Sequence, residues 1–239
     1  MPINIIILAA GTPSHSALKL DYPICLTELN GSSILERIVY NSRNIEDSTY
    51  TFAIRKPDIK RFHLDKVARL LVPKAFICSV PDGTQGSACT ALLATCGLHS
   101  EYELLIISTN ELVDLDMSLP VKDFRNRNLD AGTLTFKSVH PRYSYVKINS
   151  SNQIIQAAQR EPISQHATVG IFWFRNTKSF IDASQCMIRK NVTIDEMFYI
   201  APTLNELILA QKQLGSYPID VAKYFPLKTE QQANQFEQG

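Results

Sequence analysis

The residues best placed to do chemistry stand just beyond the ends of apolar runs that predict buried strands. Gly11 follows the first such run of the chain, and Asn110 follows a later one. Gln85 and Gly86 lie in a short turn before a helix-like stretch of small residues. Ligands of open α/β sheets bind outside the carboxyl ends of the strands. These four residues therefore predict a ligand-binding cleft at one edge of a sheet.

Three carboxylates come soon after Asn110, at Glu111, Asp114 and Asp116. Carboxylate oxygens are ligands that Mg²⁺ accepts, and a bound divalent cation can clamp a diphosphate. Glu111 adjoins Asn110 and could reach the same cation through a shifted backbone. If a cation is needed there, we expect Glu111 or Asp116 to be its ligand beside Asn110. The alternative is that these acids are solvated loop positions.

A second group of polar and aromatic side chains lies between two predicted strands, at His140, Tyr143 and Tyr145. Such a group could line a sugar pocket. Packing of the aromatic rings across neighbouring strands explains the same pattern equally well, so both interpretations stay open.

The cysteines favour no metal or redox chemistry. There are five of them, an odd number, and no two have the C-x-x-C spacing of a zinc or redox site. Cysteine is among the residues most often buried, so free buried thiols are the expectation.

The first half of the chain alternates strand-like and helix-like segments. Continuous β-branched and aliphatic runs predict buried strands at residues 3–9, 50–55, 75–80 and 103–107. Helical spacing of apolar residues predicts a helix from residue 34 and further helices at 57–71 and 87–98. This alternation predicts a parallel sheet.

From about residue 131 the predicted strands follow one another more closely, which favours antiparallel pairing. They cover residues 133–139, 144–148, 153–157 and 168–174. Two helices are expected at 177–188 and 199–214 and a last strand at 216–221, before a Gln-rich end from residue 229.

Composition narrows the classes of protein that fit. The 239 residues hold 24 Lys and Arg against 23 Asp and Glu, a net charge of +1, so a strongly electrostatic nucleic-acid binder is not expected. The longest apolar run, residues 5–10, is far shorter than the roughly 18 residues of a membrane span. No basic segment precedes it as in a signal peptide, so a cytoplasmic protein without a membrane span is the expectation.

Several segments carry a recognisable pattern when they are taken together and in order. They are residues 8–15 (LAAGTPSH), 22–26 (YPICL), 29–35 (LNGSSIL), 83–88 (GTQGSA), 104–110 (LLIISTN), 139–146 (VHPRYSYV), 162–172 (PISQHATVGIF) and 196–208 (EMFYIAPTLNELI). This set resembles the sugar-phosphate nucleotidyltransferase family, and within it the subgroup found in capsule and surface-polysaccharide loci. The likeness spans roughly residues 3 to 227.

The resemblance implies a reaction and a set of partners. Members of the family join a nucleoside triphosphate to a sugar 1-phosphate, or to a similar phosphorylated small molecule, and release pyrophosphate with the help of Mg²⁺. The nucleotide-binding residues that it implies are Leu8, Ala10, Gly11, Gln85, Gly86 and Asn110. The acceptor-binding residues that it implies are Tyr145, Gln159, Arg160, Thr168 and Gly170, with Arg160 neutralising the acceptor phosphate.

The chain departs from the family pattern where charge matters most, because this chemistry depends on positioning and on neutralising phosphate charge. Pro13 stands for a glycine and removes a backbone N–H, and His15 stands for an arginine. Ile24 replaces a lysine, and Asn110 replaces an acidic metal ligand. Lys19, in the same first loop, could reach the phosphates instead, although an exposed loop lysine is the simpler interpretation. Lys19 and His15 are the catalytic candidates.

Three functions follow from these observations. The first is an active nucleotidyltransferase with Mg²⁺, and the second is a homologue that has lost catalysis and keeps a ligand-binding, regulatory or assembly role with a protein partner or a second copy. The third is a metal-dependent glycosyltransferase, because Asp114 and Asp116 resemble the Asp-x-Asp motif of enzymes that use nucleotide sugars.

The expected fold is α/β: a Rossmann-like, mostly parallel sheet flanked by helices, of the nucleotidyltransferase (GT-A-like) kind, with a β-rich acceptor lobe. We expect one domain over residues 1–239. Its nucleotide half would end near residue 130, its acceptor half would cover about 131–228, and a polar tail would follow at 229–239.

Overall fold

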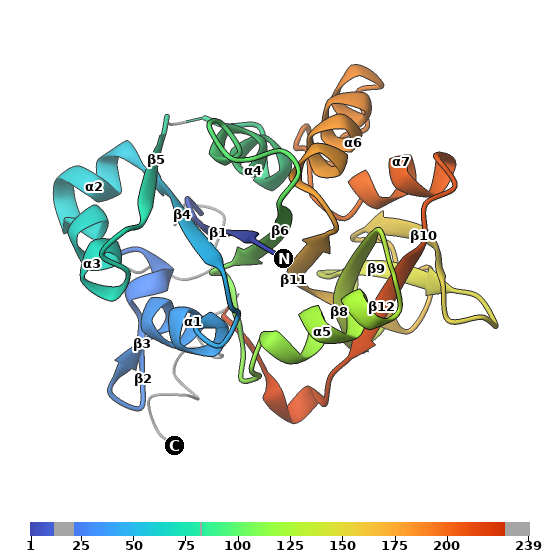
Figure 1. The fold of residues 1–239 in the computed structure, drawn as a ribbon, viewed down its shortest axis with the longest axis horizontal. Helices are drawn as coiled ribbons and strands as arrows, with labels where there is room; N and C mark the ends of the chain where they lie inside the picture. Colours follow the sequence, from blue (N-terminus) through green and yellow to red (C-terminus); the bar gives the residue numbers. More distant parts are fainter. Residues whose placement is uncertain (12–21, 82, 228–239) are drawn as a thin grey trace.

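The computed structural model describes residues 1–11, 22–81 and 83–227 (Figure 1). Its first half is built on four parallel strands. They are β1 (Ile3–Ala9), β4 (Ser48–Arg55), β5 (Phe76–Val80) and β6 (Glu103–Ser108). β1 lies in the middle, paired with β4 on one side and β6 on the other, and all seven of its residues are buried. A strand covered on both faces needs the unbroken apolar run that the sequence has there.

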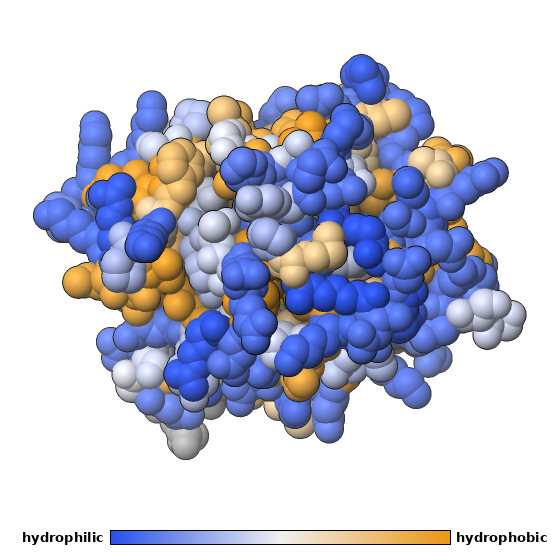
Figure 2. Space-filling view, in the orientation of Figure 1, coloured by the Kyte–Doolittle hydropathy of each residue, from blue (hydrophilic) through white to orange (hydrophobic). Residues whose placement is uncertain are grey.

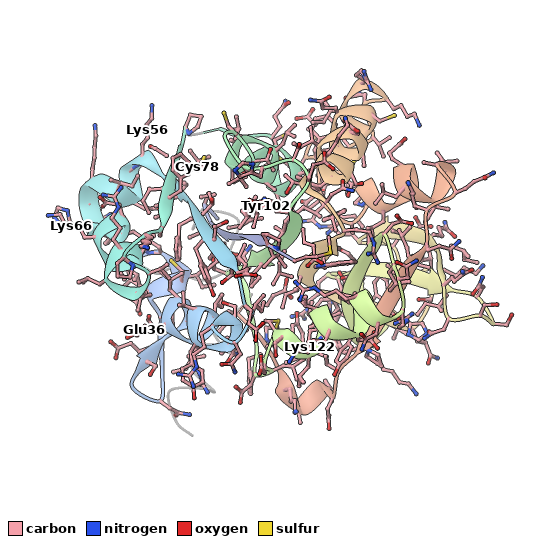
Figure 3. All side chains as sticks on the ribbon, in the orientation of Figure 1. Glu36, Lys56, Lys66, Cys78, Tyr102 and Lys122 are labelled. Atoms are coloured by element: carbon pink, nitrogen blue, oxygen red, sulfur yellow. The ribbon has the colours of Figure 1, made fainter. Side chains whose placement is uncertain are left out.

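Four helices connect these strands: α1 (Ile34–Ser42), α2 (Lys56–Phe62), α3 (Leu64–Leu71) and α4 (Ser87–Ala94). α1 begins with a capping box. The Ser33 hydroxyl accepts the backbone N–H of Glu36 at 3.2 Å, and the Glu36 carboxylate accepts that of Ser33 at 2.6 Å. Glu36 is labelled in Figure 3. A short 3₁₀ turn (Ile24–Leu26) and the small hairpin of β2 (Glu28–Leu29) and β3 (Ser32–Ser33) lead into this helix.

The second half adds five strands to the same sheet. They are β8 (Ala131–Lys137), β9 (Ser144–Ile148), β10 (Ile154–Gln159), β11 (His166–Phe174) and β12 (Leu214–Pro218). β11 runs antiparallel to β6 and so joins the two halves. Among the described residues the strand order is β10-β9-β11-β6-β1-β4-β5, and β8 pairs with both β11 and β12. A separate two-stranded sheet joins β7 (Glu111–Val113) to β13 (Tyr224–Pro226).

Helices cover both faces of the sheet. α1, α3 and α5 (Ser118–Asn126) pack on the face that carries Ile3, Ile5 and Ile7 of β1. α4, α6 (Thr177–Arg189) and α7 (Thr203–Leu209) pack on the face that carries Ile6 and Leu8. The fold class is therefore as predicted: a mostly parallel central sheet flanked by helices.

A short 3₁₀ turn (Val221–Lys223) precedes β13. None of the helices in the described part of the chain is long and apolar enough to cross a membrane.

Three predicted helices differ from the structure. The helix predicted at 87–98 ends at Ala94. The segment predicted as one helix at 57–71 is two, because His63 adopts a left-handed conformation (φ +51°) that ends α2 and begins α3. The helix predicted at 199–214 covers only Thr203–Leu209, and Leu214 already belongs to β12.

Candidate functional site

Gly11 and Asn110 meet at the carboxyl edge of the sheet, as the strand pattern predicted. The backbone N–H and the hydroxyl of Thr109 both donate to the carbonyl of Leu8, at 3.3 Å and 3.0 Å, and so fix the end of β6 against β1. A Cβ added to Gly11 would lie 2.9 Å from Oδ1 of Asn110. The Asn110 amide therefore stands directly over Gly11.

Glu111 turns the opposite way and is buried. Its carboxylate accepts a hydrogen bond from the hydroxyl of Tyr224, and the same carboxylate fills the space where a side chain at Gly170 would be. Gly170 itself has a left-handed φ of +67°, at an irregularity in the pairing of β11 with β8. Glu111 is thus held between the last described strand and the acceptor half of the sheet.

Tyr224 connects Glu111 to further aromatic residues. Its ring centroid lies 4.4 Å from that of Phe136 and 6.0 Å from that of Tyr143. Burial, and next the negative charge of Glu111, raise the pKa of the Tyr224 hydroxyl above its usual range, so this hydroxyl stays protonated and donates. The backbone N–H of Leu227 then donates to the carbonyl of Asn110 at 3.3 Å. The C-terminal strand thereby fixes the backbone of both Asn110 and Glu111.

Gln85 and Gly86 contact a segment far away in the sequence. The carbonyl of Gln85 accepts the backbone N–H of Phe198 at 2.9 Å, and the carbonyl of Phe198 accepts that of Ala88 at 3.0 Å. Gly86 has a φ of +100°, and a Cβ there would overlap the backbone of Phe198. The turn before α4 therefore needs glycine at this position both for its conformation and for the close approach.

Arg160 lies directly after β10, in the second half of the chain. Its backbone N–H donates to the carbonyl of Tyr143 at 2.9 Å, and its guanidinium forms an ion pair with Asp195. Asp195 and Glu196 form a tight turn in which Ile194 and Met197 bond each other through both backbone N–H groups. Because Phe198 follows directly, this turn joins Arg160 to the Gln85–Gly86 segment. Contacts thus link Gly11 to Asn110 on one side, and Arg160 to Gly86 through Asp195 and Phe198 on the other.

Three expected acceptor-binding residues have structural contacts. Tyr145 is fully buried and its hydroxyl donates to the carbonyl of His140 at 2.6 Å, while Thr168 is buried in β11 opposite Thr135. Gln159 accepts a hydrogen bond from the Ser144 hydroxyl across the β9–β10 pair. The sequence left two interpretations of Tyr145 open, a sugar pocket and cross-strand packing. Its burial and its hydrogen bond to His140 fit cross-strand packing.

Asp116 does not lie with Glu111 and Asn110. Its carboxylate accepts hydrogen bonds from the Asn44 side chain and from the backbone N–H of Ser118, both at 2.9 Å. Asn44 comes after the end of α1 and shortly before β4 begins, at the amino edge of the sheet. Asn110 follows the carboxyl end of β6, whereas Asp116 is bonded to a residue at the opposite edge. The hydrogen bonds at Asp116 are those of a loop that begins α5.

The fit of Mg²⁺ can be judged from the donor atoms near Asn110. The residue beside Glu111 on the neighbouring strand is Pro226, which has no side-chain oxygen. Glu111 is engaged by Tyr224, which leaves the Asn110 amide as the exposed oxygen donor, a poor set for a hard cation. Residues 1–11, 22–81 and 83–227 contain no group of three or more side chains suited to hold a metal ion. Within these ranges the residues do not fit Mg²⁺.

Other predicted positions are placed as follows. Pro13, His15 and Lys19 lie outside the described residues. Ile24, which stands where a lysine was expected, packs half-buried against the core beside α1. Asp114 is exposed, and its backbone N–H donates to the carbonyl of Lys223.

The comparisons with known proteins bear on the fold. No protein-family model matches the sequence, and no curated protein matches it. Solved structures do match. One is a nucleoside-diphosphate-sugar pyrophosphorylase from Vibrio cholerae RC9, at a TM-score of 0.81 and 17% identity, over 98% of this chain and 100% of that one. The chain has the nucleotidyltransferase fold.

Two further structures show the same nucleotidyltransferase fold. A Bacillus anthracis protein assigned as a glucose-1-phosphate thymidylyltransferase, in complex with sucrose, matches at a TM-score of 0.76 and 18% identity, over 98% of this chain and 94% of that chain. A UDP-glucose pyrophosphorylase complexed with UDP-glucose matches at 0.76 and 10% identity, over 100% of this chain and 98% of that chain. At these identities the likeness establishes the fold.

Sequence reasoning missed three residues of the site: Asp195, Phe198 and Tyr224. Asp195 and Tyr224 act through partners 35 and 113 positions away, and no spacing in a sequence reveals such a pair. Phe198 acts through its backbone, which leaves no trace in its side-chain type. The sign that could have been read is Gly86, since a glycine before a helix of small residues indicates a close approach.

Proposed function

We propose that this protein binds a nucleoside triphosphate and a sugar 1-phosphate, or a similar phosphorylated acceptor, and transfers the nucleotidyl group to the acceptor. The reaction would serve activated-sugar or surface-polysaccharide synthesis. Residues up to about 130 would bind the nucleotide, and residues from about 131 would bind the acceptor. The observation that carries the proposal is a nucleotidyltransferase fold in which Gly11 lies against Asn110, and in which Arg160 is linked through Asp195 and Phe198 to Gly86.

The chemistry is an in-line displacement at phosphorus. An oxygen of the acceptor phosphate forms a bond to the α-phosphorus of the nucleotide, and the bond to the β-phosphate breaks, releasing pyrophosphate. The backbone at Ala10 and Gly11 would bind the nucleotide beside the Asn110 amide, and the turn at Gln85 and Gly86 would contact the base. Arg160 would neutralise the acceptor phosphate.

Binding of both substrates can be tested by thermal shift. The panel contains nucleoside triphosphates, nucleoside diphosphate sugars and sugar 1-phosphates, each with and without Mg²⁺. A ligand at about 100 times its Kd stabilises a protein by roughly 2.7 kcal/mol, which is readily seen. Stabilisation by one triphosphate and by a sugar 1-phosphate, followed by pyrophosphate release when both are present, is the expected result. Stabilisation by nucleotide sugars alone would point to a glycosyltransferase instead, and no stabilisation at all would refute substrate binding.

A second candidate is a homologue that binds these ligands without turnover. The donor atoms at Asn110 favour it, because the one buried carboxylate beside it is bonded to Tyr224 and Pro226 takes the neighbouring position. The double substitution Asn110→Asp with Ile24→Lys restores two of the missing charges. If those charges are all that has been lost, pyrophosphate release should rise with Mg²⁺ in the double variant. Ligand binding without release in both proteins would establish the second candidate.

A further inference from the structure

The guanidinium of Arg160, which the acceptor phosphate would need, is already in an ion pair with Asp195. Arg160 is the residue that the proposed function assigns to that phosphate. In the structure its guanidinium is bonded by one carboxylate oxygen of Asp195. The Arg160 guanidinium also lies 5.8 Å from the ring centroid of Tyr199. An acidic side chain of the protein thus stands where an acidic ligand is expected.

The backbone at both ends of this pair is unusual. Arg160 has a φ of +59°, and Asp195 and Glu196 have φ values of +50° and +60°. Left-handed conformations cost about 1 kcal/mol or more for residues other than glycine, and they persist where surrounding contacts hold them. Here the contacts are the backbone bonds of Arg160 to Tyr143 and of Ile194 to Met197. The backbone positions from which the two side chains extend are therefore fixed.

We propose that Asp195 is an internal competitor for the acceptor phosphate: it holds Arg160 in the unliganded protein and is displaced when a phosphorylated acceptor binds. The proposal rests on the proposed function, since it concerns the acceptor site of that function. Displacement is favourable because a phosphate can meet the guanidinium through two oxygens, whereas Asp195 uses one.

The exposure of the pair sets how strongly Asp195 competes. The side chains of Arg160 and Asp195 are 49% and 69% exposed. Exposed ion pairs change an equilibrium by a factor of about five at most. Asp195 therefore lowers acceptor affinity modestly, and its removal should tighten binding by about two- to fivefold.

Displacement also reaches the nucleotide side. The turn that carries Asp195 continues into Phe198, whose backbone bonds Gln85 and Ala88. Release of Asp195 from Arg160 removes the ion pair between this turn and the end of β10, while the turn remains bonded to the segment expected to contact the base. Asp195 thus contacts the residue expected to bind the acceptor phosphate, and its turn adjoins the segment expected to bind the nucleotide.

The test compares two substitutions on the same turn. Asp195→Asn removes the charge while keeping a residue that tolerates the left-handed conformation, so the variant should fold. Glu196→Gln removes the same charge one residue away and controls for the change in net charge. Calorimetric titration with glucose 1-phosphate and with inorganic phosphate should show a two- to fivefold tighter Kd for Asp195→Asn and an unchanged Kd for Glu196→Gln.

The variant Arg160→Gln, alone and combined with Asp195→Asn, completes a double-mutant cycle. With Arg160 absent, Asp195→Asn should no longer change the Kd, because there is no cation to release. Equal Kd values for wild type, Asp195→Asn and Glu196→Gln would overturn the competitor role while leaving the acceptor site intact. Failure of both phosphates to bind any of the variants would overturn the acceptor site itself, and the competitor role with it.

Discussion

Gly11 and Gly86 both lack room for a side chain, but different atoms stand in the way. At Gly11 the nearest atoms belong to the exposed side chain of Asn110, which can rotate. At Gly86 they belong to the backbone of Phe198, which cannot move without breaking its hydrogen bonds. A substitution at Gly11 should therefore affect mainly ligand binding, whereas a substitution at Gly86 should affect mainly stability.

Gly11→Ala should leave the free energy of unfolding within about 0.5 kcal/mol of wild type, since only a surface side chain must move. It should weaken nucleotide binding, because the added methyl group pushes the Asn110 amide into the space expected for the nucleotide. Gly86→Ala should cost about 2–4 kcal/mol, from the left-handed φ together with the backbone clash. Urea denaturation and a nucleotide titration measure both effects. Equal destabilisation by the two substitutions would contradict this account of the site.

For single residues, the sequence predicts where a residue lies better than which way its side chain points. The meeting of Gly11 with Asn110 could be foreseen, because both follow parallel neighbouring strands. That Glu111 faces inward could not be, since it depends on Tyr224, a partner 113 positions away. Tyr145 and Thr168 have polar groups compatible with a ligand, and only the pairing of their strands reveals that both are buried.

Asn205 of α7 completes the outer edge of β10. Its side-chain oxygen accepts the backbone N–H of Ala157, and its amide donates to the carbonyl of the same residue, both at 2.8 Å. Asn205→Ala leaves both groups of a buried residue without this partner, so it should destabilise the protein by about 2–4 kcal/mol. Asn126→Ala, on an exposed position, should change stability by less than about 0.5 kcal/mol. Amide exchange at Ala157 reports the effect locally, and an unchanged exchange rate would disprove the role of Asn205.

Asp116 gives the start of α5 a dependence on pH. Burial favours its neutral form, but the hydrogen bonds from Asn44 and from Ser118 outweigh it and lower its pKa. A carboxyl group whose pKa is lowered by folding stabilises the protein above its unfolded pKa, about 3.9, and this contribution is lost as pH falls through the folded value. Asp116→Asn should therefore destabilise by up to about 1 kcal/mol at pH 7 and by progressively less below pH 4.

Urea denaturation of Asp116→Asn at several pH values measures this dependence. The same variant should leave ligand binding unchanged, because Asp116 lies at the amino edge. A loss of binding would instead support the sequence-based prediction of Asp116 as a metal ligand.

Elements were predictable where one physical signal dominated. The buried strands β1 and β6 were predicted almost to the residue, because their apolar runs are unbroken. The break at His63 was not predicted, because apolar spacing continues through it and only the backbone turns. The β7–β13 pair was missed as well, since each strand has three residues.

The two halves of the molecule share one sheet and the hydrophobic cluster on each of its faces. The hydrophobic cluster on the face of α1 extends from Ile3 and Phe52 in the first half to Leu134 and Trp173 in the second. Trp173 lies where the halves join: its indole N–H donates to Glu103 at 3.3 Å, and its ring stacks on Phe124 at 5.6 Å. The expected division near residue 130 thus crosses a continuous hydrophobic cluster.

A shared core predicts cooperative unfolding. Trp173 is the only tryptophan of the chain, so its fluorescence reports the junction, while far-UV circular dichroism reports both halves. The two signals should follow one urea transition with a common midpoint. A circular dichroism change that precedes or follows the fluorescence change would mean that one half unfolds by itself.

The other edge of the sheet has no counterpart to Asn205 among the described residues, and this affects how the chain behaves when it is not fully folded. In the described part of the chain β5 pairs with β4 alone, and Phe76 of β5 and Leu70 of α3 are both exposed. Figure 2 shows apolar surface over α3 and β5. The five residues of β5 carry no charge, which makes them the kind of segment that nucleates aggregates. Lys74 before the strand and Pro81 after it are residues that interrupt growing β-sheet. Solubility during synthesis therefore depends on two side chains that have no part in the candidate site.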